Sequence, residues 1–204
     1  MVGVTEHYFS VNPTSPEKRG LIRCTLRGFS LEFVTSSGVF SHSRIDNGTR
    51  LLIESMELPD EGCLLDLGCG YGPIGITAAL LNPRLEITMS DVNSRAVALA
   101  AKNIARNGAK NITTRQGNLY EPVETTMFDA IITNPPISAG MTKVVEPIIT
   151  GAPTRLNIGG SIQLVVRSNK GGRTVFAIIE KTFGETLILA KGSGYRVLKG
   201  VKKS

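Results

Sequence analysis

Hydrophobic residues fall into two kinds of segment along this chain, and the two kinds alternate. Short runs rich in Leu, Ile and Val and bounded by Gly, Pro or Asp are typical of buried strands, whereas longer runs of strong helix formers are typical of helices. The expected strands are 63–67, 85–90, 112–116, 128–133 and 161–166, and the expected helices among them are 74–81, 94–104, 142–157 and 174–183. Strands and helices in alternation predict an α/β protein.

The N-terminal part carries a different pattern. Segments 21–26 and 30–35 are β-prone and are separated by three residues, which predicts a hairpin. The apolar run 50–56 predicts a helix, and either Asp46 or Thr49 could cap its N-terminus.

The C-terminal part adds two strands. Segments 185–190 and 195–199 flank a Gly-Ser-Gly turn, so they predict a hairpin in which at least one strand runs antiparallel. The helix 142–157 is expected to break at Pro147 or Pro153. Together the segments predict a Rossmann-like, seven-stranded, mostly parallel sheet with one antiparallel edge strand, helices on both faces and a small N-terminal β extension.

Length and composition predict one compact unit. The chain has 204 residues, of which 41% are hydrophobic, enough for one α/β domain with a full core. We expect an arm and hairpin over residues 1–37 and the domain over residues 38–204. No run approaches the roughly 18 apolar residues that span a bilayer. The N-terminus also lacks a basic region followed by an apolar one, so we expect a cytoplasmic protein. We further expect either a monomer or a homodimer.

Cysteine, histidine and charge narrow the choice of partners. Cys24, Cys63 and Cys69 show no C-x-x-C spacing and only two histidines are present, so we expect no metal and no disulfide framework. Through Asp129 there are 12 Lys and Arg against 14 Asp and Glu, but from Ala130 onward there are 11 against 3. A basic C-terminal part favours a phosphate backbone as partner, although a solvated basic surface gives the same pattern.

A glycine-rich loop follows the first strand of the alternating part. Glycines there let the backbone approach a ligand closely, and Pro73 is tolerated near the start of the next helix. The spacing Gly70-x-Gly72-x-x-Gly75 also matches a nicotinamide fingerprint. Two residues disfavour a pyrophosphate: Asp66 would repel it, and Pro73 removes one N–H from the helix terminus. Asp66 could instead accept hydrogen bonds, through water, from the ammonium of an amino-acid-bearing ligand.

Polar side chains follow the next two strands. Asp91 ends the strand 85–90, where a carboxylate reaches the two ribose hydroxyls of a nucleoside, in NAD and in S-adenosylmethionine alike. Asn118 follows the strand 112–116 and is a candidate for the adenine amine, with an ordinary loop residue as the alternative.

The strand 128–133 leads into Asn134-Pro135-Pro136-Ile137. Pro135 ends the strand because it has no N–H for the sheet, and consecutive prolines make the loop rigid. The Asn134 amide and the neighbouring backbone carbonyls would then present two fixed acceptors, which match the two hydrogens of a planar exocyclic amine. A strand end that happens to carry turn-forming residues is the alternative.

These motifs give the chain a family resemblance. The order and spacing of 65–72 (Leu-Asp-Leu-Gly-Cys-Gly-Tyr-Gly), Asp91 and Asn134-Pro135-Pro136-Ile137 are similar to the first, second and fourth motifs of class I S-adenosylmethionine-dependent methyltransferases. From about Gly38 to Lys199, the chain more closely resembles the methyltransferase small group, which includes the small-subunit rRNA guanine-N2 methyltransferases, and its compact archaeal-type members. The likeness includes Val39-Phe40-Ser41 and Asp46-Asn47-Gly48-Thr49.

The resemblance implies S-adenosyl-L-methionine as cofactor and RNA, most specifically rRNA or a pre-ribosomal particle, as partner. The implied cofactor-binding residues are Asp66, Gly68, Cys69, Gly70, Tyr71 and Gly72 at the methionine end, Asp91 and Val92 at the ribose, Asn118 and Leu119 at the adenine, and Asn134. The residues implied at the reacting amine are Asn134, Pro135, Pro136 and Ile137.

The chain departs from the family pattern at three points. The family usually has a stacking aromatic where Ile137 stands, so we expect Phe40, Tyr8 or Arg167 to supply that face, or apolar contact alone to hold the base. The basic loop that contains Arg167 and Lys170 is expected at the ligand edge of the sheet. Bacterial rRNA relatives also carry an additional N-terminal domain, and many have Asp in place of Asn118.

Three functions remain open. The first is direct methyl transfer to an exocyclic amine of RNA, most specifically guanine N2 of small-subunit rRNA, with Asn134 Oδ1 and the Pro135 carbonyl accepting from the amine. The second is N5 methylation of a protein glutamine, whose carboxamide also has a planar amine. The third is non-catalytic RNA binding by a nucleoside-binding fold.

Overall fold

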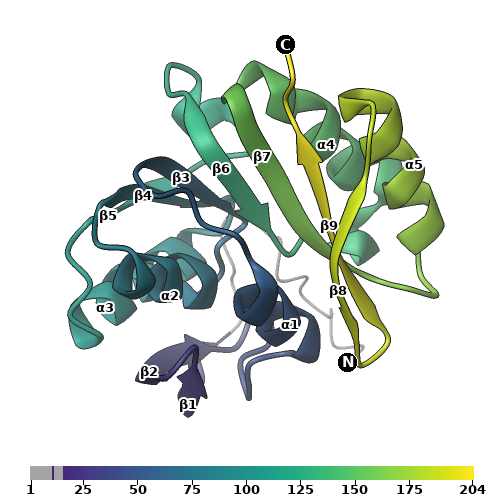
Figure 1. Ribbon diagram of the computed structural model, residues 1–204. Helices are drawn as coiled ribbons and strands as arrows, with labels where there is room; N and C mark the ends of the chain where they lie inside the picture. The colour runs from purple at the N-terminus through teal and green to yellow at the C-terminus, as the bar shows by residue number, and fades with distance from the viewer. Residues whose placement is uncertain (1–10, 12–15) are drawn as a thin grey trace.

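A seven-stranded sheet forms the centre of the computed structural model, which describes Val11 and residues 16–204 (Figure 1). Its strands are β3 (Gly62–Leu67), β4 (Leu85–Asp91), β5 (Ile112–Gln116), β6 (Phe128–Thr133), β7 (Leu156–Arg167), β8 (Leu187–Gly192) and β9 (Tyr195–Val201). Their spatial order is β5-β4-β3-β6-β7-β9-β8. No helix in this described part is long and apolar enough to cross a membrane.

The direction of the strands confirms the predicted mostly parallel sheet. Strands β3 to β7 pair in parallel with one another, and β9 pairs antiparallel with both β7 and β8. The reversed strand is therefore β9, and the edge strand β8 forms the expected hairpin with it. Chain order reverses between β3 and β6, and in open α/β sheets ligands bind outside the carboxyl ends of the strands at such a switch point.

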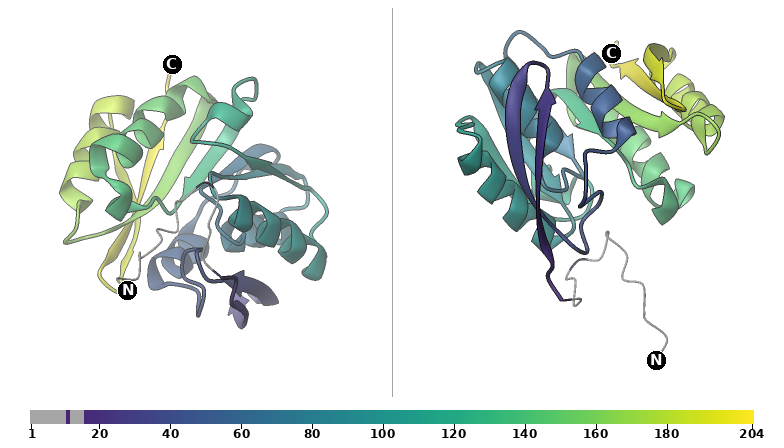
Figure 2. Two further views of the ribbon diagram at one scale, coloured as in Figure 1. Left: turned by 180° about the vertical axis from the view of Figure 1, so that it is seen from behind. Right: turned by 90° about the horizontal axis from the view of Figure 1, so that it is seen from below.

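Helices cover both faces of the sheet, as Figures 1 and 2 show. One face carries α1 (Asn47–Ser55), α2 (Pro73–Leu81) and α3 (Ser94–Arg106), and the other carries α4 (Glu146–Gly151) and α5 (Gly172–Phe183). Side chains along a strand alternate between these two layers: Leu64 lies in the first apolar cluster and Leu65 in the second. Both faces of the sheet are buried, which is why its strands are almost continuously hydrophobic.

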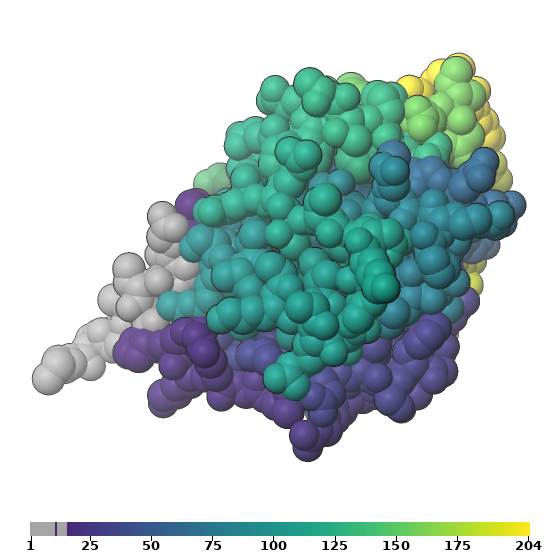
Figure 3. Space-filling model, turned by 90° about the vertical axis from the view of Figure 1, so that its left-hand side faces the viewer, coloured from purple at the N-terminus to yellow at the C-terminus, as the bar shows by residue number. Residues whose placement is uncertain are grey.

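The N-terminal β extension is a two-stranded hairpin of β1 (Arg19–Leu26) and β2 (Phe29–Ser36). Its two-residue turn, Arg27-Gly28, has positive φ at both positions, as twisted hairpins require. The hairpin packs against α3, and Figure 3 shows it in purple along the teal surface around that helix.

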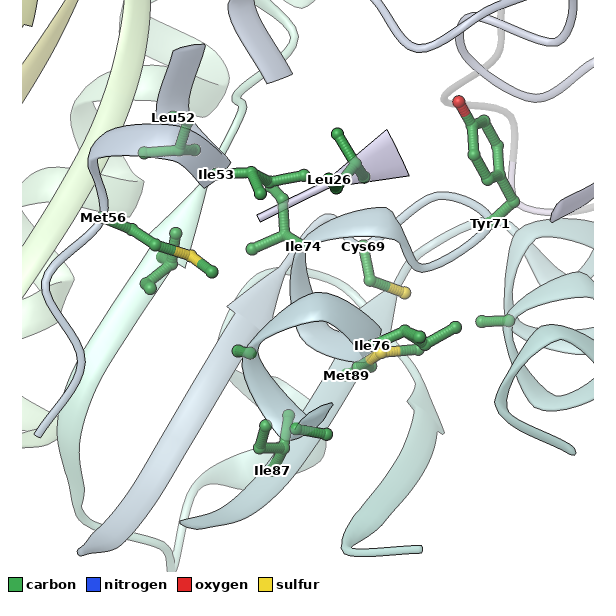
Figure 4. Close-up of a cluster of buried hydrophobic side chains, with 14 of the residues drawn as sticks. Leu26, Leu52, Ile53, Met56, Cys69, Tyr71, Ile74, Ile76, Ile87 and Met89 are labelled. Carbon is green, nitrogen blue, oxygen red and sulfur yellow. The ribbon is translucent and has the colours of Figure 1, made fainter. Parts of the chain in front are cut away.

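Buried Asn103 of α3 connects the hairpin to the glycine-rich loop. Its Oδ1 accepts from Val34 N (2.8 Å), and its Nδ2 donates to the carbonyls of Val34 and Tyr71 (2.9 Å each). Phe33 of the hairpin also packs against Tyr71, with ring centroids 5.7 Å apart. Figure 4 shows Tyr71 at one side of this apolar cluster, with Cys69 between Tyr71 and Ile74. The hairpin therefore supports the loop that follows β3.

Of the two caps left open by the sequence, Asp46 is the one that caps α1, because its carboxylate accepts the N–H groups of Gly48 and Thr49. Two expectations need correction. The segment 142–157 is a π-helical turn, the short α4 and a 3-10 turn, and its two prolines lie in the first turns of the last two, where a missing N–H is tolerated. Strand β7 begins at Leu156, before the glycines that were expected to open it.

Candidate active site

Two adjoining cavities lie at the carboxyl edge of the sheet, around the switch point between β3 and β6. The first is bordered by the loops after β3, β4, β5 and β6, and the second by the loops after β6 and β7 and the β8–β9 turn. Phe40, Ser41, Asn134 and Pro135 line both cavities, so these four residues mark the boundary between them. A ligand in the first cavity and a second ligand in the other would meet at Asn134.

Most of the predicted cofactor residues line the first cavity. Those that do are Gly68, Cys69, Gly70, Tyr71, Asp91, Val92, Asn118, Leu119 and Asn134, and the two that do not are Asp66 and Gly72. The structure thus brings together loops that are far apart in the sequence, as parallel strands with a common carboxyl edge require.

The glycine-rich loop is held by its neighbour strand. The N–H groups of Gly68 and Cys69 both donate to the Ser90 carbonyl (2.8 and 2.9 Å). Gly70 and Gly72 have φ of 57° and 97°, a region that favours glycine, and α2 begins at the next residue, Pro73. Gly68 and Gly70 line the cavity, so at these two positions the loop presents backbone without a Cβ.

The Asp91 carboxylate accepts two backbone N–H groups at the end of β4. Its Oδ2 accepts the N–H of Gly70 (2.8 Å) and its Oδ1 accepts the N–H of Asn93 (2.9 Å), which fixes the carboxylate and the glycine-rich loop together. Burial raises the pKa of Asp91, although the backbone N–H groups around it act in the opposite direction. Each oxygen has a further lone pair, so the carboxylate can still accept from a hydroxyl in the cavity.

Asp66 lies behind the loop and not on the cavity wall. Its side chain is fully buried, its Oδ2 accepts the N–H of Gly75 (2.9 Å), and its Oδ1 has no hydrogen-bond partner among the described residues. Burial raises the pKa of this carboxyl to about 7. A Cβ on Gly75 would collide with Met89, so glycine is required where α2 passes β4.

The Asn-Pro-Pro loop is a tight turn. The Ile137 N–H donates to the Pro135 carbonyl (2.9 Å) across Pro136, whose φ of −75° and ψ of 84° are those of an inverse γ-turn. This bond fixes the orientation of the Pro135 carbonyl and leaves one of its two lone pairs for another donor. The expected rigidity of this loop thus has a second cause besides the prolines.

The Asn134 side chain is oriented by α1. Its Nδ2 donates to Asp46 Oδ2 (3.0 Å) and to Thr49 Oγ1 (2.8 Å), so Oδ1 is directed away from these two groups. Sequence reasoning identified Asp46 only as a helix cap and missed its bond to Asn134, because the two residues are 88 positions apart. The only available signal was an acidic N-cap inside the segment of the family resemblance.

The second cavity contains the predicted substrate residues Phe40, Arg167 and Lys170, together with Ile137, which was predicted at the reacting amine. Tyr8 lies outside the described residues. The Arg167 guanidinium lies 5.3 Å from the centroid of the Tyr195 ring, and its Nε lies 3.1 Å from the Tyr195 hydroxyl. These contacts hold the planar guanidinium in place over an aromatic face.

Arg44 and Tyr195 also line the second cavity and were missed by sequence reasoning. Arg44 lies in an irregular segment, and Tyr195 was assigned only to a strand, so neither had a motif that could have identified it.

The chemistry of the first cavity fits the expected cofactor. The apolar side chains of Leu119 and Ile148 suit a flat base, the carboxylate of Asp91 suits ribose hydroxyls, and the bare loop backbone allows close approach. The buried Asp66 Oδ1, behind the loop, is a polar atom without a hydrogen-bond partner among the described residues. Within the described residues no cluster of His, Cys, Asp and Glu is arranged to hold a metal ion.

Comparison with known proteins gives three consistent results. A family model of the methyltransferase small domain matches residues 30–199. The chain is 38% identical to the uncharacterized protein YbxB of Bacillus subtilis, over 98% of this chain and 100% of that protein. It is 32% identical to ribosomal RNA small subunit methyltransferase C of Serratia proteamaculans, over 82% of this chain but 48% of that protein.

Among solved structures, the fold is similar to the T. thermophilus 16S rRNA N2 G1207 methyltransferase (RsmC) in complex with AdoMet and guanosine. The TM-score is 0.82 and the sequence identity 26%, with 94% of this chain and 52% of that chain covered. The chain therefore spans about half the length of the rRNA methyltransferases that it matches.

Proposed function

Because this chain belongs to the methyltransferase small domain family and is an S-adenosylmethionine-dependent methyltransferase, we propose that it methylates an exocyclic amine of RNA, most specifically guanine N2 of small-subunit rRNA. In this proposal the first cavity holds the cofactor and the second holds the base. Such a substrate belongs to the cytoplasm, where ribosomes work.

The position of Asn134 carries the proposal. Asn134 and Pro135 line both cavities, which supports a role for the Asn134 side-chain oxygen and the Pro135 carbonyl where a methyl donor and a methyl acceptor would meet. Both amide hydrogens of Asn134 are directed to Asp46 and Thr49, which leaves Oδ1 to accept. Two acceptors on a rigid turn suit a group that donates two hydrogens, which is an exocyclic amine and not a hydroxyl.

The charge of the second cavity favours RNA over a protein glutamine. Arg44, Arg167 and Lys170 line it, and all three can contact phosphate. A base must leave its helix or come from a single-stranded segment to enter such a pocket. The relatives support this substrate, since the Serratia protein is named a small-subunit rRNA methyltransferase and the T. thermophilus structure contains guanosine.

The residues of the chain then have defined tasks in the reaction. The cofactor, when bound, supplies a methyl group on a sulfonium. The Asn134 Oδ1 and the Pro135 carbonyl accept the two amine hydrogens and orient the nitrogen lone pair toward that methyl group. Transfer of that methyl group to the nitrogen, with cleavage of its bond to sulfur, would place positive charge on the nitrogen, and the same two oxygens would stabilise this charge. One proton of the methylated amine is released to solvent afterwards.

Transfer of tritium from labelled S-adenosylmethionine tests this function. We expect the protein to label 16S rRNA or small ribosomal subunits, with the label in N2-methylguanine after nuclease digestion. Asn134→Ala should lower kcat by roughly 100-fold or more, because an orienting and charge-stabilising acceptor is lost.

The matched control is Asn157→Ala, which removes a different Asn–Asp side-chain hydrogen bond (2.8 Å), outside both cavities. This variant should keep the parental rate. Label that enters only protein would refute RNA as the substrate and favour a glutamine acceptor. Cofactor binding without any transfer would favour a non-catalytic role.

A further inference from the structure

We infer that Asp46 and Thr49 are positioning residues that hold the Asn134 amide in the one orientation that accepts an amine. This inference rests on the proposed function and extends it to residues on α1. The two residues act through Asn134, and neither is assigned a contact with the reacting atoms.

The hydrogen bonds of Asn134 have only one consistent direction. Asp46 Oδ2 lies 3.0 Å from Asn134 Nδ2, and an ionised carboxylate has no hydrogen to donate, so the amide must turn its NH2 group toward it. Thr49 donates its hydroxyl hydrogen to the same carboxylate oxygen, so its Oγ1 is left to accept the second amide hydrogen at 2.8 Å. The oxygen of Asn134 therefore has to face away from α1.

The carboxylate that imposes this direction is itself immobilised. Asp46 Oδ1 accepts the N–H of Gly48 (2.8 Å) and Oδ2 accepts the N–H of Thr49 (3.0 Å), which is the N-cap of α1. Helix α1 is anchored in the core by Leu52 and Ile53, both fully buried. The cap thus links the reacting loop after β6 to a rigid helix, which limits motion of the amide.

The orientation of the Asn134 amide decides which group of a substrate can be methylated. A reversed Asn134 would place its NH2 group against the NH2 of the substrate, where neither group can accept. The charge of Asp46 also polarises the amide, so Oδ1 becomes a stronger acceptor for a nitrogen that gains positive charge during transfer. Asp46 and Thr49 therefore favour methylation of an amine over methylation of an oxygen. They raise kcat more than they raise the affinity for the substrate.

Asp46→Asn separates positioning from helix capping. Asn is as good an N-cap as Asp, so the thermal midpoint should stay close to that of the parent. The new side chain has an NH2 group of its own, which permits Asn134 to reverse. We expect kcat to fall about 10- to 100-fold, as for loss of a hydrogen bond to a charged group, with KM for the cofactor within about twofold.

Thr49 offers a matched pair of variants. Thr49→Ala removes the second acceptor and should lower kcat about 3- to 10-fold, whereas Thr49→Ser keeps the hydroxyl and should retain the parental kcat. In the Asn134→Ala background, Asp46→Asn should have no further effect on kcat, because the group through which it acts is absent. A further loss of tenfold or more in that background, or a parental kcat in Asp46→Asn, would overturn the inference.

A second readout does not need the RNA substrate. The Asn134 side-chain NH2 signals in a nitrogen–proton correlation spectrum are identified by their absence in Asn134→Ala. We expect them to shift strongly in Asp46→Asn and little in Thr49→Ser. Unchanged signals in Asp46→Asn would overturn the positioning role even if the wild-type enzyme methylates RNA. A wild type that binds S-adenosylmethionine but methylates no RNA, with shifted signals in Asp46→Asn, would instead refute the proposed function alone.

Discussion

Asp66→Asn should stabilise the protein at alkaline pH and not at acidic pH. Asp66 is fully buried behind the glycine-rich loop, and burial raises its pKa from 3.8 to about 7. The folded protein therefore keeps this proton at pH values where the unfolded chain has released it. The contribution of the protonated carboxyl is fully present below about pH 4 and is lost as the pH rises to about 7, above which the loss is complete.

The size of the effect follows from the pKa shift. The loss occurs between about pH 4 and about pH 7, so a change from pH 5 to pH 8 covers about two pH units of it. Each unit corresponds to about 1.4 kcal/mol, so the free energy of unfolding of the wild type falls by about 3 kcal/mol through Asp66 alone. Asparagine cannot ionise, and its oxygen can still accept the Gly75 N–H. Any cost of burying its NH2 group is the same at both pH values and cancels in the comparison.

Urea unfolding at pH 5 and pH 8 measures this difference. With a slope of about 2 kcal/mol per M, the midpoint of Asp66→Asn should gain roughly 1.5 M on the wild type between the two pH values. Ser90→Ala is the matched control, because Ser90 is also buried with a hydroxyl that lacks a partner among the described residues, but it does not titrate near neutrality. A midpoint difference between Asp66→Asn and wild type that is the same at both pH values would refute the raised pKa.

Two further variants test the two cavities. Asp91→Ala removes the acceptor for the N–H groups of Gly70 and Asn93. The Kd for S-adenosylmethionine, measured by calorimetry, should therefore rise at least about tenfold. An unchanged Kd would contradict the role of this carboxylate. Lys170→Ala should weaken RNA binding and reduce the slope of log K against log salt by about 0.7 to 1. As a control, Lys181→Ala, at an exposed position on α5, should change neither the affinity nor the slope. Equal slopes for the two variants would exclude Lys170 from phosphate contact.

The strands of the parallel sheet could be predicted because they are apolar runs whose ends are marked by polar or turn-forming residues. Strands β5 and β6 begin and end at the residues that the sequence pattern predicted, and β6 is closed by an Asn-Pro-Pro turn. The start of β7 was not predictable, since Gly159-Gly160 reads as a strand boundary. A Cβ on Gly160 would lie 3.1 Å from the carbonyl oxygens of Phe128 and Asp129, so this glycine permits close approach of two strands.

The predicted part of the site consists of residues that follow strand ends. Asp91 and Asn134 could be identified because parallel strands present their carboxyl ends at one edge, whatever the details of packing. The partners of these residues depend on tertiary contacts. Asp46 reaches Asn134 only because α1 packs over β7, and Tyr195 reaches Arg167 only because β9 pairs antiparallel with β7.

Three carboxylates accept backbone N–H groups near the carboxyl edge of the sheet: Asp46 caps α1, Asp66 accepts from α2, and Asp91 accepts from the glycine-rich loop. Each of these segments is therefore fixed before any ligand enters, which reduces the reorganisation that binding and reaction require. In the proposed reaction the positive charge moves from the first cavity toward the second, so a fixed dipole at their boundary would stabilise the transition state more than the bound substrates. Asn134 lies at that boundary, and its dipole direction is imposed by Asp46. The rate should consequently depend on the residues that fix this dipole as well as on those that contact the ligands.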